Sequence, residues 1–324
     1  MNTSIYQKIQ DFIAKHALIL AVVNWAKTTS LPGFHKTPIW YIVSFIWKEI
    51  WRDDLFIRAQ AISFSFFLSL FPSIIALFTM LPLLNTTMFR FLPQSAELEY
   101  ILYEEIKSIM PGEAGTELFD FIKDTIISPR IALFSFGFIL AIYFGSSGMM
   151  TLMRSFEKSY EVVFRQRAYW RKQLVAIALI FVLFFLSLIS VVFIITGSYI
   201  VDWLVNSFRL DWFSFVGLAL VRWVVILFIF YAGIGFIYRY GAATHQRFPF
   251  LSPGTTLATL LCIVISVVFS FYVDNFGTYN QFYGSLGALI VIMLWIEFNV
   301  MALLIGFELN LSIAIHRDLK EPLD

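Results

Sequence analysis

Long apolar runs alternate with polar segments along this chain, and these runs predict its fold. A helix needs roughly 20 largely apolar residues to cross the hydrocarbon core of a bilayer. The predicted spans are Ala59–Leu84, Ile131–Met153, Leu174–Val201, Phe213–Tyr238, Thr255–Val273 and Ser285–Ile315. A bilayer offers no water to the backbone, so each N–H and C=O must be satisfied within its own segment, and runs of this length form helices. The pattern therefore predicts an all-α, polytopic membrane protein with six transmembrane helices.

The loops between the runs alternate in Lys and Arg content. Seven Lys and Arg precede the first span, and six lie between the second and third spans. The connection between the third and fourth spans has only Arg209, and the connection between the fifth and sixth has none. The long loop of residues 85–130 carries four Lys and Arg but eight Asp and Glu. Because loops rich in Lys and Arg remain on the cytoplasmic side, both termini are predicted to be cytoplasmic.

Two regions outside the spans are predicted to be helical. In the exterior loop, apolar residues recur at helical spacing on both sides of Pro111-Gly112, which indicates two amphipathic helices. An ordinary solvated loop is the alternative. Residues 9–26 and 38–51 hold apolar stretches that are too short to span, and their tryptophans favour interfacial helices. The predicted organisation is an N-terminal segment 1–54, a transmembrane domain 55–315 with its exterior loop 85–130, and a tail 316–324.

Composition narrows the classes of function. Hydrophobic residues make up 59% of the chain and charged residues 14%, against about 25% charged residues in soluble domains. The net charge of +1 gives no general attraction for nucleic acid. The single cysteine, Cys262, lies inside the fifth predicted span, so we expect no intrachain disulfide and no cysteine-based metal site. The first 54 residues are mixed and charged, and we expect no cleavable signal peptide.

Ionisable residues inside the predicted spans are candidates for a transport path. Such groups cost at least ~2.5 kcal/mol at the bilayer centre on insertion scales and usually face a cavity or a partner. Arg222 lies in the fourth span, and Glu297 and Glu308 lie in the sixth. The two acids share one helical stripe, roughly 16 Å apart at 1.5 Å per residue, and Asn299 lies on another face. The stripe either lines a polar path, with Arg222 attracting an anionic headgroup or a carboxylate, or forms buried pairs that hold helices together.

Three further residues are candidates for helix breaks. Pro72 removes a backbone hydrogen bond in the first span and should kink that helix unless neighbours compensate. Gly145 and Gly148 are expected to bend the second span near its inner end. Broken helices recur at transporter binding sites, whereas small residues more often serve close helix packing. Both interpretations remain open from the sequence.

Four phrases along the spans carry a family resemblance. They are Arg58-Ala-Gln-Ala-Ile-Ser-Phe-Ser-Phe-Phe-Leu-Ser-Leu-Phe-Pro72, Phe144-Gly-Ser-Ser-Gly148 leading into Met153-Arg-Ser-Phe-Glu-Lys-Ser-Tyr160, Tyr283-Gly-Ser-Leu-Gly287, and Leu304-Ile-Gly-Phe-Glu-Leu-Asn310. From about residue 45 to residue 315 the chain resembles the YihY/BrkB family of bacterial inner-membrane proteins. The resemblance implies six transmembrane helices with cytoplasmic termini in the bacterial inner membrane.

The resemblance leaves the activity open. Members of the family have been labelled ribonuclease BN, associated with serum resistance, or proposed as transporters or lipid exporters. A metal-dependent nuclease needs His and carboxylate groups gathered around its ion, but none of the four His lies within four residues of another. Residues 154–172 carry six Lys and Arg, yet a short cytoplasmic loop is basic by default. We therefore expect no enzymatic activity, no catalytic residues, no metal, no cofactor and no nucleic-acid partner.

Two classes of function remain. The first is transport of an amphipathic or lipid-like solute by a flippase or exporter. The second is a non-transporting scaffold or regulator of the cell envelope, whose exterior loop 85–130 binds an envelope protein. Membrane lipids are partners in both cases, and the sequence favours no oligomeric state. A transporter should place Arg222, Glu297 and Asn299 around one hydrated cavity, whereas a scaffold should bury them as closed pairs.

Overall fold

A computed structural model shows a helical bundle. It describes residues 17–30, 33–34, 37–52, 55–87, 103, 116, 119–120, 123, 131–157, 163–208, 213–275 and 285–320. The helices are α2 (Ala17–Thr28), α3 (Ile39–Arg52), α4 (Leu55–Thr87), α7 (Ile131–Phe156), α8 (Tyr169–Phe208), α9 (Phe213–Phe236), the π-helix η1 (Ile237–Gly241), α10 (Pro253–Asn275) and α12 (Ser285–Lys320). This part of the chain contains no β-strand, only an isolated bridge between Phe164 and Thr244. The all-α prediction is confirmed.

The long helices coincide with the six predicted runs. Within the described residues, five of them are long and apolar enough to cross a membrane: α4, α7, α8, α10 and α12. Helix α9 forms over the remaining run, Phe213–Phe236, and continues into η1. A polytopic membrane protein is therefore confirmed, whereas the number of six spans stays a prediction.

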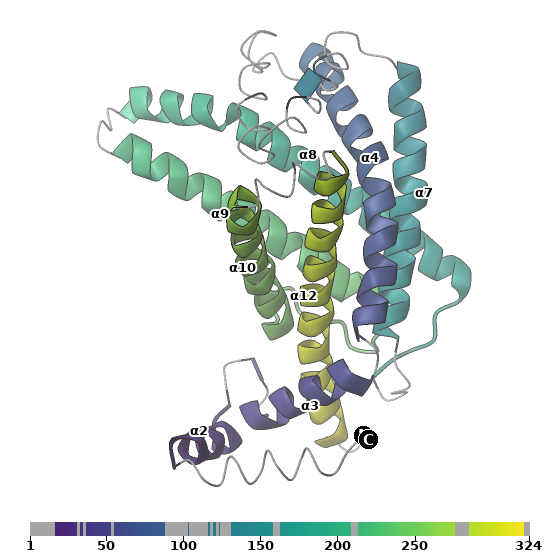
Figure 1. Ribbon diagram of the computed structural model, residues 1–324, viewed down its shortest axis with the longest axis vertical. Coiled ribbons are helices and arrows are strands. Elements are labelled where there is room, and N and C mark those ends of the chain that lie inside the picture. The colour runs from purple at the N-terminus through teal and green to yellow at the C-terminus, as the bar shows by residue number, and fades with distance from the viewer. Residues whose placement is uncertain are drawn as a thin grey trace.

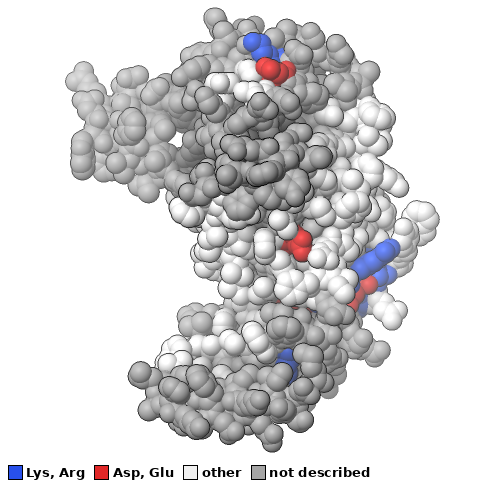
Figure 2. All heavy atoms as spheres, viewed as in Figure 1, with Lys and Arg blue, Asp and Glu red and all other residues white. Residues whose placement is uncertain are grey.

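The helices form a bundle with an oblique hairpin. Helices α4 and α7 lie side by side, α12 lies beside α4, and α10 lies beside α12 (Figure 1). Helices α8 and α9 form a hairpin that runs obliquely to these four (Figure 1). Helix α3 and the C-terminal end of α12 lie at the same end of the bundle, which we call the inner end (Figure 1). The described residues in the middle of the face in Figure 2 are mostly uncharged apart from an acidic side chain, as expected for a surface in contact with lipid.

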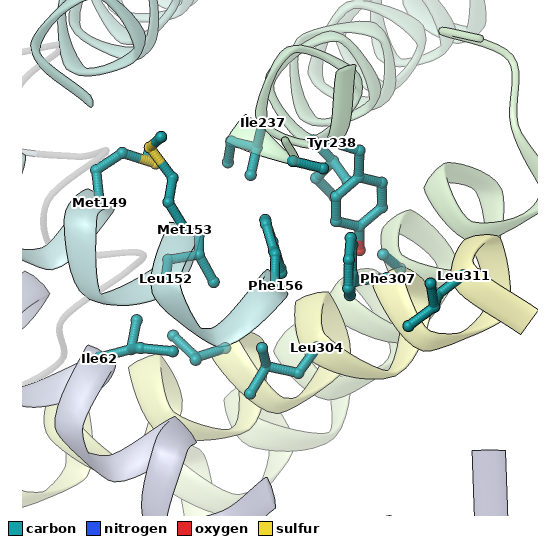
Figure 3. Packing of buried hydrophobic residues seen from close by; sticks show 14 of the residues in the cluster. Ile62, Met149, Leu152, Met153, Phe156, Ile237, Tyr238, Leu304, Phe307 and Leu311 are labelled. Atoms are coloured by element: carbon teal, nitrogen blue, oxygen red, sulfur yellow. The ribbon is translucent and has the colours of Figure 1, made fainter. Parts of the chain in front are cut away.

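Aromatic rings close the core near the inner end. The rings of Phe156 and Phe307 are stacked with centroids 4.1 Å apart, and Tyr238 contacts both rings (Figure 3). The Tyr238 hydroxyl donates a 2.6 Å hydrogen bond to the Leu303 carbonyl, which satisfies the polar end of a fully buried ring. We call the following five residues the aromatic layer: Phe156, Phe164, Tyr238, Phe248 and Phe307.

Helix α3 covers the C-terminal part of α12. Ile42 on α3 and Phe34 before it pack in a small buried cluster with Leu309 and Ile313 of α12. Trp47 on the opposite side of α3 is exposed. A short helix with one face on protein and aromatic side chains on another suits the bilayer interface, as the sequence predicts.

The helix ends differ in places from the predicted boundaries. Helix α12 continues to Lys320, so the segment predicted as a tail from residue 316 begins inside a helix. Most of the exterior loop lies outside the described residues, but Tyr103 and Phe119 are helical and their rings pack edge to face at 5.1 Å. This contact joins the two stretches that the sequence predicts as separate helices.

Candidate functional site

Helix α12 carries three of the four predicted path residues, namely Glu297, Asn299 and Glu308. Of these, Asn299 faces α10. Its side-chain nitrogen donates to the Trp295 carbonyl at 2.7 Å, and its backbone carbonyl lies 3.9 Å from Cys262 Sγ. The Trp295 indole in turn donates to Ser266 Oγ on α10 at 3.2 Å. The Oδ1 atom of Asn299 is buried and has no hydrogen-bond partner among the described residues. Asn299 therefore keeps one acceptor available inside the bundle.

Asn310 lies eleven residues after Asn299 on the same face of α12, and its side chain forms hydrogen bonds with the start of α10. Its Oδ1 accepts from the Gly254 backbone N–H at 2.9 Å, and its Nδ2 donates to Ser252 Oγ at 2.9 Å. Ser252 Oγ also accepts from the Thr255 N–H at 3.2 Å, as a helix N-cap does. The first turn of α10 thus has its free N–H groups satisfied by α12 as well as by its own cap. We assign Asn310 a structural role.

Two glycines let α10 and α12 touch at this point. A Cβ atom on Gly306 would lie 2.6 Å from the Gly254 carbonyl oxygen and 2.6 Å from Tyr238 Oη. A Cβ atom on Gly254 would overlap the Gly306 carbonyl oxygen. Close contact of backbones through small residues is a common way to pack helices in membranes, where lipid is as apolar as the side chains.

Glu308 is buried and faces α4. Its Oε1 lies 3.8 Å from Arg58 Nη2, and only 1% of its side chain is exposed. The Nη1 atom of Arg58 donates to the Ser155 carbonyl of α7 at 2.9 Å. One guanidinium therefore joins α4, α7 and α12 directly beside the aromatic layer, to which Phe156 and Phe307 belong. We call the aromatic layer together with Arg58 and Glu308 the inner seal.

Glu297 lies where α12 is packed less tightly. Every residue of α12 from Gly306 to Ile315 is buried, whereas between Leu289 and Glu297 only Ile296 is. Glu297 itself is half-buried, so its carboxylate has access to surroundings that Glu308 lacks. Arg222 lies within α9, and its side chain falls outside the described residues. The roles of Arg222, Glu297 and Asn299 in a transport path stay predictions.

A pocket of about 150 Å³ opens between α4, α7 and α8. Ser69 and Ser73 of α4, Gly145 of α7 and Ser187 of α8 line it together with apolar side chains. The hydroxyl of Ser69 donates to the Phe66 carbonyl and that of Ser73 to the Ser69 carbonyl. Because these two hydroxyls are bonded within their own helix, the pocket presents a mainly apolar surface. None of the predicted path residues lines this pocket.

The three helix-break candidates lie within continuous helices. Helix α4 runs from Leu55 to Thr87 through Pro72, and α7 runs from Ile131 to Phe156 through Gly145 and Gly148. A Cβ atom on Gly148 would lie 3.0 Å from the Phe66 ring, and one on Gly145 would lie 3.2 Å from Ile180 Cδ1. The two glycines allow α7 to approach α4 and α8, which is the packing alternative that the sequence left open.

Several residues of this region are absent from the sequence-based candidates. Arg58 belongs to the first quoted phrase, but its pairing with Glu308 depends on which helix each faces. Gly254 and Gly306 have no marked spacing along the chain, because they meet between two helices. Among the described residues, no group of three or more His, Cys, Asp or Glu could hold a metal ion.

Comparisons with known proteins agree with the helical membrane architecture. A sequence model of the family described as virulence factor BrkB matches residues 46–324. The ribonuclease-like protein YfkH of Bacillus subtilis is 28% identical over 273 residues, which cover 82% of this chain and 91% of YfkH. A UPF0761 membrane protein of Tolumonas auensis is 24% identical over 273 residues, which cover 83% of this chain and 84% of that protein. A UPF0761 membrane protein of Xanthomonas campestris is 36% identical over 81 residues, or 25% of this chain and 19% of that protein. No solved structure matches the chain.

Proposed function

This chain belongs to the virulence factor BrkB family of membrane proteins, and we propose that it transports an amphipathic or lipid-like solute across the bilayer. The solute would occupy the half-exposed polar residues of α12, and opening of the inner seal would connect this position to the inner side of the membrane. Glu297 and Asn299 would contact the polar part of the solute. Arg222 would contribute a positive charge from α9.

The uneven packing of α12 supports this proposal. At the inner end, the helix is buried on all sides and the inner seal closes the bundle. Further along, Glu297 is half-buried and Asn299 keeps a buried acceptor without a partner among the described residues. A carboxylate inside a span is costly unless water or a polar partner reaches it. A path that is closed at one end and polar in its middle explains why α12 is fully buried at its inner end and only partly buried around Glu297.

The proposal also includes an orientation. The chain would lie in the bacterial inner membrane with both termini in the cytoplasm, so that the inner seal faces the cytoplasm. Two observations support this orientation: the alternation of Lys and Arg among the loops, and the position of α3 and the end of α12 at one end of the bundle.

We propose no enzymatic activity, although the name of the Bacillus relative refers to a ribonuclease. Hydrolysis assisted by a metal needs several ligands around one ion. The four His of this sequence are well separated: His16, His35, His245 and His316.

A vesicle assay tests the transport proposal. The purified chain is reconstituted into vesicles that contain a trace of fluorescent phosphatidylglycerol, and a membrane-impermeant reductant reports how fast the lipid changes leaflet. The wild-type protein should accelerate this movement over protein-free vesicles. Glu297→Gln and Arg222→Ala should lose the acceleration while they remain folded. Glu157→Gln, the same chemical change in an acid that pairs with Lys172 outside the span, should retain it.

Equal rates with and without wild-type protein would contradict transport of this lipid class. One contact favours the scaffold alternative in that event. Tyr103 packs on Phe119 in the exterior loop, so this loop has a folded element that an envelope protein could recognise.

A further inference from the structure

Two loops at the inner end are far apart in the sequence but are joined by backbone hydrogen bonds. Phe164, in the segment between α7 and α8, forms an antiparallel bridge with Thr244, which follows η1. The Arg165 N–H donates to the Ala243 carbonyl at 2.8 Å, and the His245 N–H donates to the Val163 carbonyl at 2.9 Å. The bridge brings the arginines of both loops to one surface.

These arginines gather around Tyr240 of η1. Arg167 donates to the Tyr240 carbonyl at 2.8 Å and to the Ala242 carbonyl at 2.9 Å, so it caps the free carbonyls at the end of this helix. The Arg247 guanidinium lies 5.2 Å from the centre of the Tyr240 ring, and that of Arg239 lies 5.9 Å from it. The guanidinium groups of Arg239 and Arg247 therefore pack on the Tyr240 ring, and that of Arg167 binds the Tyr240 backbone carbonyl.

The local charge is not balanced. Arg165 and Arg247 are both close enough to Arg167 to lower its pKa, although burial is the larger cause of that lowered pKa. Glu157 is the acid that acts on Arg167, and it already pairs with Lys172 at 2.7 Å. Within the described part of the chain, none of the arginines around Tyr240 forms an ion pair with a carboxylate. Four arginines therefore lie around this bridge, and Glu157 is the one carboxylate among the described residues that acts on Arg167.

Arg239 has a free donor in this group. Its Nη1 donates to the Phe248 carbonyl at 3.1 Å, but its buried Nε has no hydrogen-bond partner among the described residues. A buried guanidinium N–H without an acceptor costs free energy, and an anionic oxygen would satisfy it.

Exposed apolar side chains lie close to the arginines in the sequence. Trp170, in the first turn of α8, is 76% exposed, and Leu251, just before α10, is 83% exposed. Lys and Arg gather beside acidic atoms at the right edge of the face in Figure 2, near the start of α8 in Figure 1. Apolar and aromatic side chains beside guanidinium groups at a helix end match the boundary between acyl chains and headgroups.

We propose that Arg165, Arg239 and Arg247 form a binding site for the phosphate of an anionic phospholipid in the leaflet at the inner end. The phosphate oxygens accept from the guanidinium groups, and the acyl chains lie along Trp170 and Leu251. Arg167 does not bind the phosphate itself; it stabilises the end of η1 through its hydrogen bonds to the Tyr240 and Ala242 carbonyls. This site does not depend on the proposed transport function, because a bound lipid at this position need not cross the membrane.

Lipid binding to the full-length chain tests the site. Native mass spectrometry is used to titrate the detergent-solubilised protein with phosphatidylglycerol and with phosphatidylcholine of the same acyl chains. The wild type should bind phosphatidylglycerol more tightly. The double variant Arg165→Gln/Arg247→Gln should lose about 30-fold in that affinity, since each basic residue near an anionic surface contributes on the order of 1 kcal/mol. Both residues are exposed, and thermal unfolding in phosphatidylcholine checks that the variant folds.

A matched control removes two other exposed positive charges, in Lys48→Gln/Arg154→Gln. This control should bind phosphatidylglycerol as the wild type does. An equal loss in both double variants would overturn the site, because the effect would then be one of general charge. Full competition by millimolar inorganic phosphate would also overturn it, since the site would then take a soluble anion rather than a lipid.

Discussion

The Arg58 guanidinium lies 3.8 Å from the Glu308 carboxylate and also donates to the Ser155 carbonyl. This contact connects the first and last long helices of the bundle with α7. Both residues lie beside the aromatic layer, so the charges and the rings close the same end of the molecule. Opening that end would require the pair to separate.

The pair should behave as a coupled unit in stability measurements. Arg58→Ala removes the cation that lies 3.8 Å from a carboxylate whose side chain is 1% exposed, and breaking a buried pair costs roughly 3 kcal/mol or more. Its thermal unfolding temperature in detergent should therefore fall clearly below that of the wild type. Arg58→Leu/Glu308→Leu should recover most of this loss, because both charges of the pair are then replaced by apolar side chains. If the double variant were less stable than Arg58→Ala, the contact would not be the source of the effect.

The crossing of α10 and α12 should tolerate no added methyl group. Gly306→Ala would place its Cβ 2.6 Å from a backbone oxygen of Gly254, and overpacking of this kind costs about 1–3 kcal/mol. The variant should have a lower unfolding temperature and lower abundance in the membrane. Gly241→Ala is the matched control, because the nearest atoms to its Cβ would lie at 3.6 Å. Equal tolerance of both changes would mean that the helices can separate without cost.

The third prediction concerns the orientation of the chain in the membrane. Reporter tags at residues 1 and 324 should both respond as cytoplasmic, and a tag at Glu113 should respond as exterior. The physical reason is the excess of Lys and Arg in alternate loops. A cytoplasmic tag at residue 1 together with an exterior tag at residue 324 would contradict an even number of spans.

The sequence predicts where the helices lie along the chain better than it predicts which helices pack against one another. Apolar runs long enough to cross a bilayer are a local property, and the described helices follow them closely, as α10 does over Pro253–Asn275. Periodicity also places Glu297 and Glu308 on one stripe of α12. It does not indicate that α4 covers this stripe at Glu308 and leaves it half-buried at Glu297, because that difference depends on how the helices cross.

The same distinction applies to the small and polar residues. Asn310 and Asn299 share a face of α12, but Asn310 caps α10 whereas Asn299 keeps a buried acceptor. Gly145 and Gly148 are consistent with either a bend or a close contact when they are considered alone. The structure shows a continuous α7 in contact with α4 and α8 at these positions. Only the neighbouring helix distinguishes such alternatives.

The central claim is a path that reaches Glu297 from the outer side and is closed at the inner end. The single cysteine can be removed as Cys262→Ala, and a new cysteine placed by Glu297→Cys or, as a control, by Phe298→Cys on an adjacent face of the same helix. A membrane-impermeant maleimide is then added to vesicles of either orientation. Our account predicts that the cysteine at position 297 is labelled only when the reagent faces the outer side, and that the control cysteine is labelled from neither. Labelling of position 297 from the inner side, or none from either side, would contradict the account.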